Sequence, residues 1–226
     1  MPRRARGRKQ KKEGPFVRWL VYTLFLGFAA IFLSSIALNY LGMLAQSDFL
    51  VYATIAQSML FSLVVFVYLS VRGKTLKQAI SELGLNRKTL NRSTLFLALL
   101  LFLVVLALEF GIGIFQVVTG IQVPTNVQQV FAGLPLYFVV FTVVVAPINE
   151  EILFRGFLVP RIGIIFSALI FAALHYLSYN SIAEFIAALV FGLLAGYVRE
   201  RYKSLYPSII AHVAINLIGM LALAIL

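Results

Sequence analysis

The chain has 226 residues, of which 62% are hydrophobic and only 12% are charged, and it contains no cysteine. A soluble domain of this length could not cover so much apolar surface with so few polar groups, so the composition indicates an integral membrane protein. Its apolar segments are long, whereas a β-barrel would show alternating segments of ~10 residues, so we expect an all-α, polytopic helical bundle. The lack of cysteine excludes disulfides, thiolate catalysis, palmitoylation and cysteine zinc sites.

The first segment, residues 1–15, is strongly basic and is followed by an apolar run too long for the core of a signal peptide. We therefore interpret it as a retained cytoplasmic tail. The net charge of +11 is mostly located in this tail and in a few connections, which is typical of membrane topology and of contact with anionic lipids. No nucleic-acid partner is expected.

Residues 16–226 are expected to form one membrane domain. Seven stretches reach the ~17 residues that a membrane helix needs. They are residues 17–44, 50–71, 94–118, 134–159, 162–178, 182–198 and 206–226. The connection 72–93 is the longest polar segment between spans. The spacing of four of its side chains predicts a short amphipathic helix on the membrane surface, namely Leu76, Ile80, Leu83 and Leu85.

Lys and Arg are unevenly shared between the two sides of the predicted bundle. The tail carries seven of the nineteen, and the connection 72–93 carries six. The links after the fourth and sixth spans add Arg161, Arg199, Arg201 and Lys203. The remaining connections contain none, and they lie near 45–49, 119–133 and 179–181. With seven spans, all the basic segments lie on one side, which predicts a cytoplasmic N-terminus and a C-terminus outside.

The stretch INEEILFRGF, residues 148–157, places Glu150, Glu151 and Arg155 inside the fourth span. An ionisable side chain inside a bilayer costs at least ~2.5–3.5 kcal/mol on insertion scales, so a function is expected. Glu151 and Arg155 stand four residues apart with the acid first, which is the favourable order for an ion pair. Glu150 points about 100° away around the helix and has no partner nearby in the sequence. An unpaired buried carboxyl suits a general acid or base.

Both histidines lie in spans, and each has a companion four residues away. Phe171 precedes His175 in FAALH, and Asn216 follows His212 in HVAIN. The members of each pair therefore face the same way. At ~1.5 Å per residue, Glu150 and His175 lie roughly 15–20 Å from the cytoplasmic end of their helices, and His212 and Asn216 roughly 9–15 Å. Because three helices place polar groups at similar depths, we expect one site, reached from the cytoplasmic face.

Three motifs occur in a fixed order: EEILFR at 150–155, FAALH at 171–175 and HVAIN at 212–216. Together they resemble the CAAX protease and bacteriocin-processing family of intramembrane proteases, also called the Abi family, and especially its CAAX prenyl endopeptidase type. The resemblance covers roughly residues 134–217, the expected catalytic core. The first three spans resemble the family only in their general character as membrane spans. The ISELGL segment of the connection 72–93 also resembles family members. Relatives with eight helices allow an eighth span.

The resemblance implies glutamate-dependent peptide hydrolysis inside the membrane, with no cofactor. Carried over to this chain, Glu150 would be the base that activates a water, assisted by His175. His212 and Asn216 would donate hydrogen bonds to the developing oxyanion. The substrate would be a prenylated CAAX-type C-terminus or a peptide precursor. The residues that would support the site are Glu151, Arg155 and Phe171.

Other classes of intramembrane protease do not fit the sequence. It lacks the H-E-x-x-H zinc motif and a Gly-x-Ser-Gly serine motif, and Asp48 is its only aspartate, whereas an aspartyl dyad needs two. A zinc ion held by Glu150, His175 and His212 stays open as an alternative, since two imidazoles and a carboxylate form a legitimate ligand set. The expectation is catalysis without a metal.

Two other functions would use the same features. Some family members are thought to act as immunity or scaffold proteins, which keep the fold without turnover. A transporter would also place Glu and His inside the membrane, but the sequence has no inverted repeat or broken helix pair. The expected location is a cellular membrane, the cell membrane in a prokaryote, and the expected partners are lipids and a peptide or prenylated protein.

Overall fold

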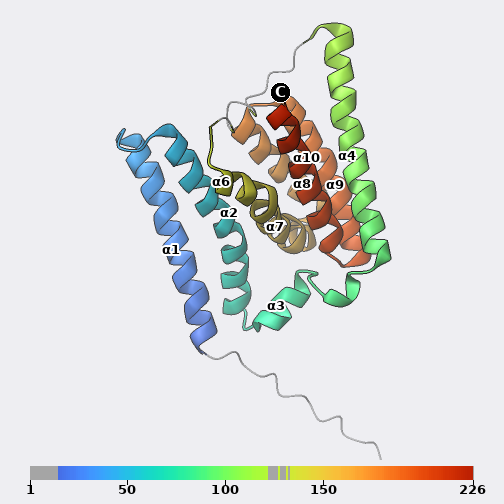
Figure 1. Ribbon diagram of the computed structural model, residues 1–226. Helices are drawn as coiled ribbons and strands as arrows, with labels where there is room; N and C mark the ends of the chain where they lie inside the picture. The colour runs from blue at the N-terminus through green and yellow to red at the C-terminus, as the bar shows by residue number, and fades with distance from the viewer. Residues whose placement is uncertain (1–14, 122–126, 128–130, 132, 226) are drawn as a thin grey trace, which may run out of the picture.

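The structure, a computed structural model, describes residues 15–121, 127, 131 and 133–225, and these contain helices and no strand (Figure 1). Apart from Pro15, the predicted basic tail lies outside the described residues. The long helices are α1 (Pro15–Tyr40), α2 (Gln46–Val71), α4 (Arg92–Thr119), α8 (Val159–Tyr179), α9 (Ile182–Tyr202) and α10 (Tyr206–Ile225). The shorter elements are α3 (Leu76–Glu82), η1 (Arg87–Thr89), α6 (Leu136–Val140), η2 (Phe141–Val145), α7 (Ala146–Glu151) and η3 (Ile152–Leu158).

Six continuous helical stretches of the described chain are long and apolar enough to cross a membrane. One of them, Leu136–Tyr179, has 44 residues, about twice the ~20 that a single crossing needs. It is broken at Gly163, whose backbone (φ 84°, ψ 168°) only glycine adopts readily. The two legs then pack against each other, with the Ser167 hydroxyl donating to the Phe154 carbonyl at 2.8 Å. This hairpin gives the seven passes predicted from the sequence, in a polytopic helical bundle.

The connections predicted to lie in the cytoplasm meet at one end of the bundle, the lower end in Figure 1. The Glu82 carboxylate accepts a hydrogen bond from Arg161 Nη2 at 3.0 Å. Arg199 Nη2 donates to the Glu82 carbonyl at 2.8 Å, and the Leu205 N–H donates to the Gly84 carbonyl at 3.0 Å. Three basic segments that are far apart in the sequence therefore share one end, as the positive-inside pattern predicts.

The amphipathic helix of the connection 72–93 is present as α3, and part of its apolar side packs against the bundle: Leu76 is 43% exposed, but Ala79 is only 3% exposed. Leu83 is only 1% exposed and packs beneath the bundle. It belongs to a buried cluster, which we call the cytoplasmic plug, formed by Val65, Leu69, Ala79, Leu83, Ile152 and Leu205. Burial against α2 and η3 removes these side chains from water as effectively as lipid would.

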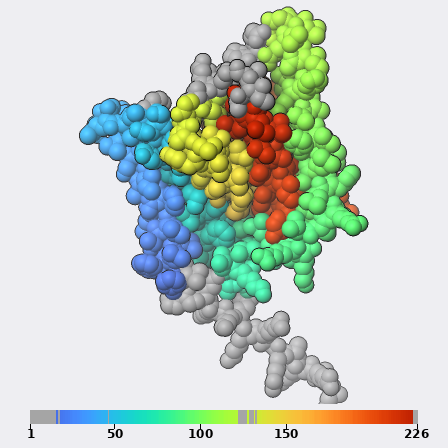
Figure 2. Space-filling model, in the orientation of Figure 1, coloured from blue at the N-terminus to red at the C-terminus, as the bar shows by residue number. Residues whose placement is uncertain are grey.

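The outer face of the bundle is apolar. Figure 2 shows α6 and α10 side by side, with α1 and α2 along one edge and α4 along the other. On α1, Trp19, Leu26 and Leu33 are each more than 60% exposed. Large apolar side chains on the outside are what contact with lipid requires, so the fold is that of a multi-pass integral membrane protein.

Candidate active site

The two adjacent glutamates lie on α7, between two π-helical turns. These are η2 and η3, each of which widens the helix relative to an ordinary α-helical turn. Pro147, near the start of α7, has no backbone N–H to donate to the preceding turn. Its presence accounts for an irregular pattern of backbone hydrogen bonds there. Such π-turns inside α-helices are frequent at functional sites.

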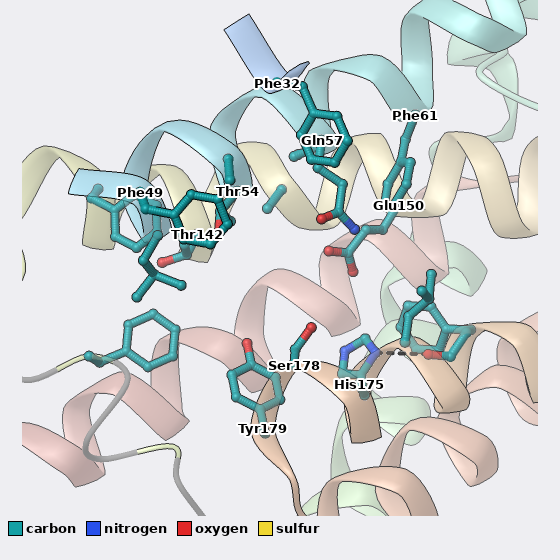
Figure 3. A pocket seen from close by; sticks show the side chains of 18 of the residues that line it. Phe32, Phe49, Thr54, Gln57, Phe61, Thr142, Glu150, His175, Ser178 and Tyr179 are labelled. Atoms are coloured by element: carbon teal, nitrogen blue, oxygen red, sulfur yellow. Dashed lines mark hydrogen bonds between the residues drawn. The ribbon is translucent and has the colours of Figure 1, made fainter. Parts of the chain in front are cut away.

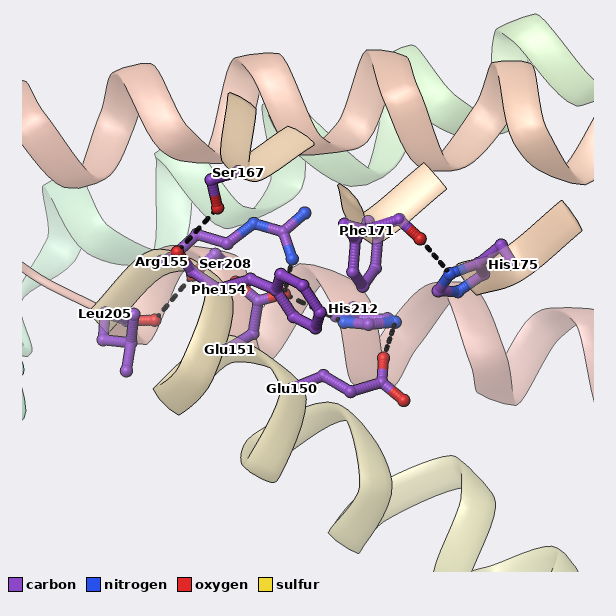
Figure 4. A network of polar contacts seen from close by, with 10 residues as sticks. All are labelled: Glu150, Glu151, Phe154, Arg155, Ser167, Phe171, His175, Leu205, Ser208 and His212. Carbon is purple, nitrogen blue, oxygen red and sulfur yellow. Dashed lines mark hydrogen bonds and ion pairs between the residues drawn. The ribbon is translucent and has the colours of Figure 1, made fainter. Parts of the chain in front are cut away.

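The Glu151–Arg155 pair predicted from its i,i+4 spacing is present and fully buried. Arg155 Nη1 donates to Glu151 Oε1 at 2.8 Å, and the side chains are 1% and 0% exposed (Figure 4). The Arg155 guanidinium also lies over the rings of Phe171 and Phe191, 4.0 and 4.9 Å from their centroids. The electron-rich ring faces attract the cation, so the charge is compensated without water.

His212 lies between the two glutamates. Its Nδ1 is 3.1 Å from Glu151 Oε1, and its Nε2 is 3.7 Å from Glu150 Oε2 (Figure 4). Because an ionised carboxylate only accepts hydrogen bonds, we place a proton on Nδ1. The rings of Phe171 and Phe191 pack beside the imidazole, with centroid-to-centroid distances of 5.8 and 5.0 Å, and restrict its orientation.

Glu150 and His175 complete a group of three converging side chains. The Glu150 side chain is 21% exposed, in contrast to the sealed Glu151. His175 Nδ1 lies 3.0 Å from the carbonyl oxygen of Phe171, which can only accept, so Nδ1 donates and Nε2 of the neutral ring is left as an acceptor. Ligand atoms of Glu150, His175 and His212 all lie within 4.8 Å of one another. The structure thus brings together the three groups that the sequence analysis assigned to one site.

Asn216 lies one turn beyond His212 and lines the same cavity as Glu150. Its Nδ2 donates to the carbonyl oxygen of Thr142 at 3.1 Å, which ties α10 to η2. A primary amide has two N–H donors, so this contact occupies only one of them.

Two adjoining cavities of ≈ 350 Å³ each meet at Glu150 and His175. The first lies between α2 and α8 and is largely aromatic, with Phe49 and Phe61 among its walls (Figure 3). The second is bounded by α10 and includes two more carboxylates, those of Glu109 and Glu184. Glu150, His175 and Asn216 therefore line open space within an otherwise packed bundle, whereas the buried His212 lines neither cavity.

The cavities extend away from the cytoplasmic plug, which differs from the access expected from the sequence. They run from Glu150 toward Thr54 near the start of α2 and Tyr179 at the end of α8. None of the described lining residues comes from the connections 72–93 or 199–205. The sequence gives the distance of a residue from the end of its helix. It does not reveal at which end of the bundle side chains from other segments close the site.

Comparison with known proteins identifies the segment that holds these groups. Residues 132–218 match the family described as type II CAAX prenyl endopeptidase Rce1-like. This core is therefore similar to the CAAX protease family. The uncharacterized protein YpbD of Bacillus subtilis (strain 168) is 30% identical over 89 residues, which cover 39% of this chain and 47% of YpbD. The chain thus matches about half the length of this curated relative. No solved structure matches it.

The matched core, residues 132–218, could also hold a metal ion. Glu150, His175 and His212 provide two imidazoles and a carboxylate, a donor set used by catalytic zinc. The Nδ1 atoms of both histidines are already held, by the Phe171 carbonyl and by Glu151, as is usual for imidazoles that bind metal through the other nitrogen. The residues fit zinc, so the metal alternative stays open beside the metal-free one.

Asn149 is a buried polar residue of the matched core that the sequence analysis missed. Its Oδ1 accepts a hydrogen bond from the Ser62 hydroxyl at 2.6 Å, and its Nδ2 donates to the Ser58 hydroxyl at 3.2 Å. All three side chains are less than 9% exposed. These contacts anchor α7 to α2 and fix the rotation of the helix that carries Glu150. The i,i+4 spacing of two serines in an apolar span was the available signal.

A second missed feature is the close contact of α9 with α8. A Cβ added at Gly192 would lie 2.9 Å from Ala168 Cβ and 3.4 Å from Arg155 Nη2. Gly196, one turn later, completes a small-xxx-small pattern, which allows membrane helices to approach closely. Arg155 thus fits into the core because α9 presents glycine there.

We expect Gly192→Ala to destabilise the protein by about 1–3 kcal/mol, the usual cost of overpacking a tight interface. The clash is with the backbone and Cβ of Ala168, which cannot rotate away. Thermal unfolding in detergent measures the effect. Gly111→Ala on α4 is the matched control, since no atom lies within 4 Å of its added methyl group. Equal melting temperatures for the two variants would contradict the prediction.

Proposed function

We propose that the chain is an intramembrane endopeptidase that hydrolyses a peptide bond with a water activated by Glu150. The observation that carries this proposal is the different setting of two adjacent carboxylates. Glu151 is sealed and bound to Arg155 and His212, whereas Glu150 is directed into a cavity beside two imidazoles. A general base must reach the substrate. Of the two adjacent carboxylates, Glu150 is the one that faces the cavity where a substrate would bind.

In the proposed first step, a water lies between Glu150 and His175. Glu150 accepts one proton of the water, while His175 Nε2 accepts a hydrogen bond from the other and orients the oxygen. The oxygen then attacks the carbonyl carbon of the substrate, and a C–O bond forms. In the second step the C–N bond breaks, and Glu150 returns its proton to the leaving amine.

His212 and Asn216 are proposed to stabilise the negative charge that develops on the carbonyl oxygen. Asn216 would donate through the N–H that Thr142 does not occupy. His212 would donate through Nε2, which requires protons on both ring nitrogens, because Nδ1 already donates to Glu151. Such donors act most strongly in a site that excludes bulk water, and the apolar walls provide that setting.

The match of residues 132–218 to the CAAX prenyl endopeptidase family supports a CAAX-type protein substrate or a peptide precursor. The test is a comparison of membrane proteins by mass spectrometry in cells with and without the chain, in search of cleavage that depends on Glu150. Purified enzyme is then assayed on the peptide so identified, with and without a chelator. Activity that survives chelation supports the metal-free step. Activity that is lost on chelation and restored by stoichiometric zinc would assign the three converging side chains to a metal instead.

Asn216→Ala is expected to lower kcat by ~10²–10³ with little change in KM, the typical effect of removing one oxyanion donor. The side chain is only partly buried, so the variant should fold and keep its cavity. Steady-state kinetics on the identified peptide measures the effect, with the melting temperature as a check on folding. An unchanged kcat would remove Asn216 from the proposed oxyanion site.

A further inference from the structure

The two ends of the catalytic cavity are not equivalent. Most of the lining residues come from the halves of their helices that lie far from the basic connections, and Phe61, Glu150 and Phe154 form the deep end. Thr54 lies eight residues after the start of α2, and Ser178 lies next to the end of α8. On α10, Gly219 lines the second cavity six residues before the C-terminal end of the helix. These three helix ends are at the same side of the bundle, the upper side in Figure 1.

The opposite end is closed by side chains. Four members of the cytoplasmic plug, Val65, Leu69, Leu83 and Leu205, are no more than 1% exposed. The plug is also fixed by hydrogen bonds, since the Leu205 N–H donates to the Gly84 carbonyl and Arg199 donates to the Glu82 carbonyl. A peptide arriving from that end would have to displace a packed core cluster and break these bonds.

Charge assigns the ends to the two sides of the membrane. The plugged end carries the basic residues Arg72, Lys74, Arg161, Arg199, Arg201 and Lys203, and the positive-inside rule places such residues in the cytoplasm. The described residues that line the two cavities include no Lys or Arg. The two cavities therefore extend toward the end of the bundle that the charge pattern places away from the cytoplasm.

We propose that the site is entered from the non-cytoplasmic side and takes a peptide whose scissile bond is presented there. This inference rests on the proposed peptidase function and deepens it by naming the side and form of the substrate. Glu150 lies 14 residues from the start of α6, so the substrate must reach ~20 Å into the bundle. At ~3.3 Å per residue, that is a segment of about six extended residues.

The segment must be extended, because a carbonyl inside a helix is already hydrogen-bonded and its carbon is shielded. The aromatic walls of the first cavity favour apolar side chains on this segment. A prenylated C-terminus presented in the cytoplasm does not meet these conditions, since the plug lies between it and Glu150. The chemistry fits instead an exported or membrane-anchored peptide that enters from outside.

Single-cysteine labelling tests the side of access, and the native chain has no cysteine to interfere. The cavity probes are Thr54→Cys and Gly219→Cys, and the latter adds a side chain where no atom lies within 4 Å. The cytoplasmic control is Arg87→Cys, at an exposed position of the basic connection 72–93. The lipid-facing control is Leu33→Cys, at a position that is 65% exposed on α1. Each is treated in intact cells with a membrane-impermeant maleimide, and again after permeabilisation.

We expect the maleimide to modify both cavity cysteines in intact cells. Arg87→Cys should react only after permeabilisation, and Leu33→Cys in neither case, because no water reaches it. Cavity cysteines that react only after permeabilisation, or not at all, would overturn the inference, as would Arg87→Cys labelled from outside. The test needs no turnover, so it can fail while the enzyme is active and pass while the enzyme is inactive.

The cleavage sites provide a second test of the same inference. Cuts that occur with the native chain and are absent with Glu150→Gln should fall in segments of the substrate outside the cytoplasm. Cuts in cytoplasmic tails would overturn the proposed direction of access while supporting the peptidase function itself.

Discussion

Glu150→Gln is expected to abolish measurable turnover while leaving the fold and substrate binding intact. The amide keeps the shape of the side chain but cannot accept a proton from water as a carboxylate does. Positioned general bases contribute typically ~10²–10⁴ in rate, and here the same group also returns the proton to the leaving amine. The variant is assayed on the peptide found by mass spectrometry, and binding is followed by retention of that peptide on the inactive protein.

The folding of this variant should be close to native, because the Glu150 side chain is 21% exposed and its ion-pair contact within the described residues is the 3.7 Å approach to His212. Glu151→Gln is the matched control, with the same chemical change one residue along the chain. It should lower the melting temperature, because it leaves the buried Arg155 without a carboxylate. Full activity in Glu150→Gln would contradict the proposed mechanism. Loss of cleavage with an unchanged cellular role would favour a scaffold function.

The passes of the bundle and its predicted orientation follow from local features of the sequence. Hydrophobic runs of sufficient length make helices, because no other arrangement satisfies the backbone in lipid. The Glu151–Arg155 pair also follows from local spacing, since residues four apart meet on one helix. The convergence of Glu150, His175 and His212 was inferred from matched depth and from family motifs, and the structure brings them together.

Features that depend on contacts between distant segments were not predictable in the same way. Asn149 and Ser62 form a hydrogen bond although they are 87 residues apart in the sequence, and no periodic sequence pattern predicts a contact of this kind. Leu83 looks like a lipid-facing residue of an amphipathic helix, yet Leu205 and Ile152 cover it. The direction of the cavity follows from that packing, because the plug closes the end from which access was expected.

Arg155→Ala should have the largest effect on stability of any substitution considered for this chain. Removing one partner of a buried ion pair leaves the other charge uncompensated, at a typical cost of ~3–5 kcal/mol. Glu151 is 0% exposed, so it cannot recover the loss by contact with water. The substitution also empties the space between Phe171 and Phe191 that the guanidinium fills. Thermal unfolding in detergent should show a melting temperature far below that of the native protein.

The double variant Glu151→Gln, Arg155→Met separates charge compensation from packing. It removes both charges while nearly preserving volume, and paired replacement of a buried ion pair is often neutral or stabilising. It should therefore unfold at a higher temperature than Arg155→Ala, with a clear coupling energy between the two sites. Its activity should still be low, because His212 Nδ1 loses the carboxylate that orients the ring toward Glu150. A stable but inactive double variant would assign the pair to the positioning of His212. Native stability and native activity in Arg155→Ala would show that the pair neither stabilises the fold nor positions His212.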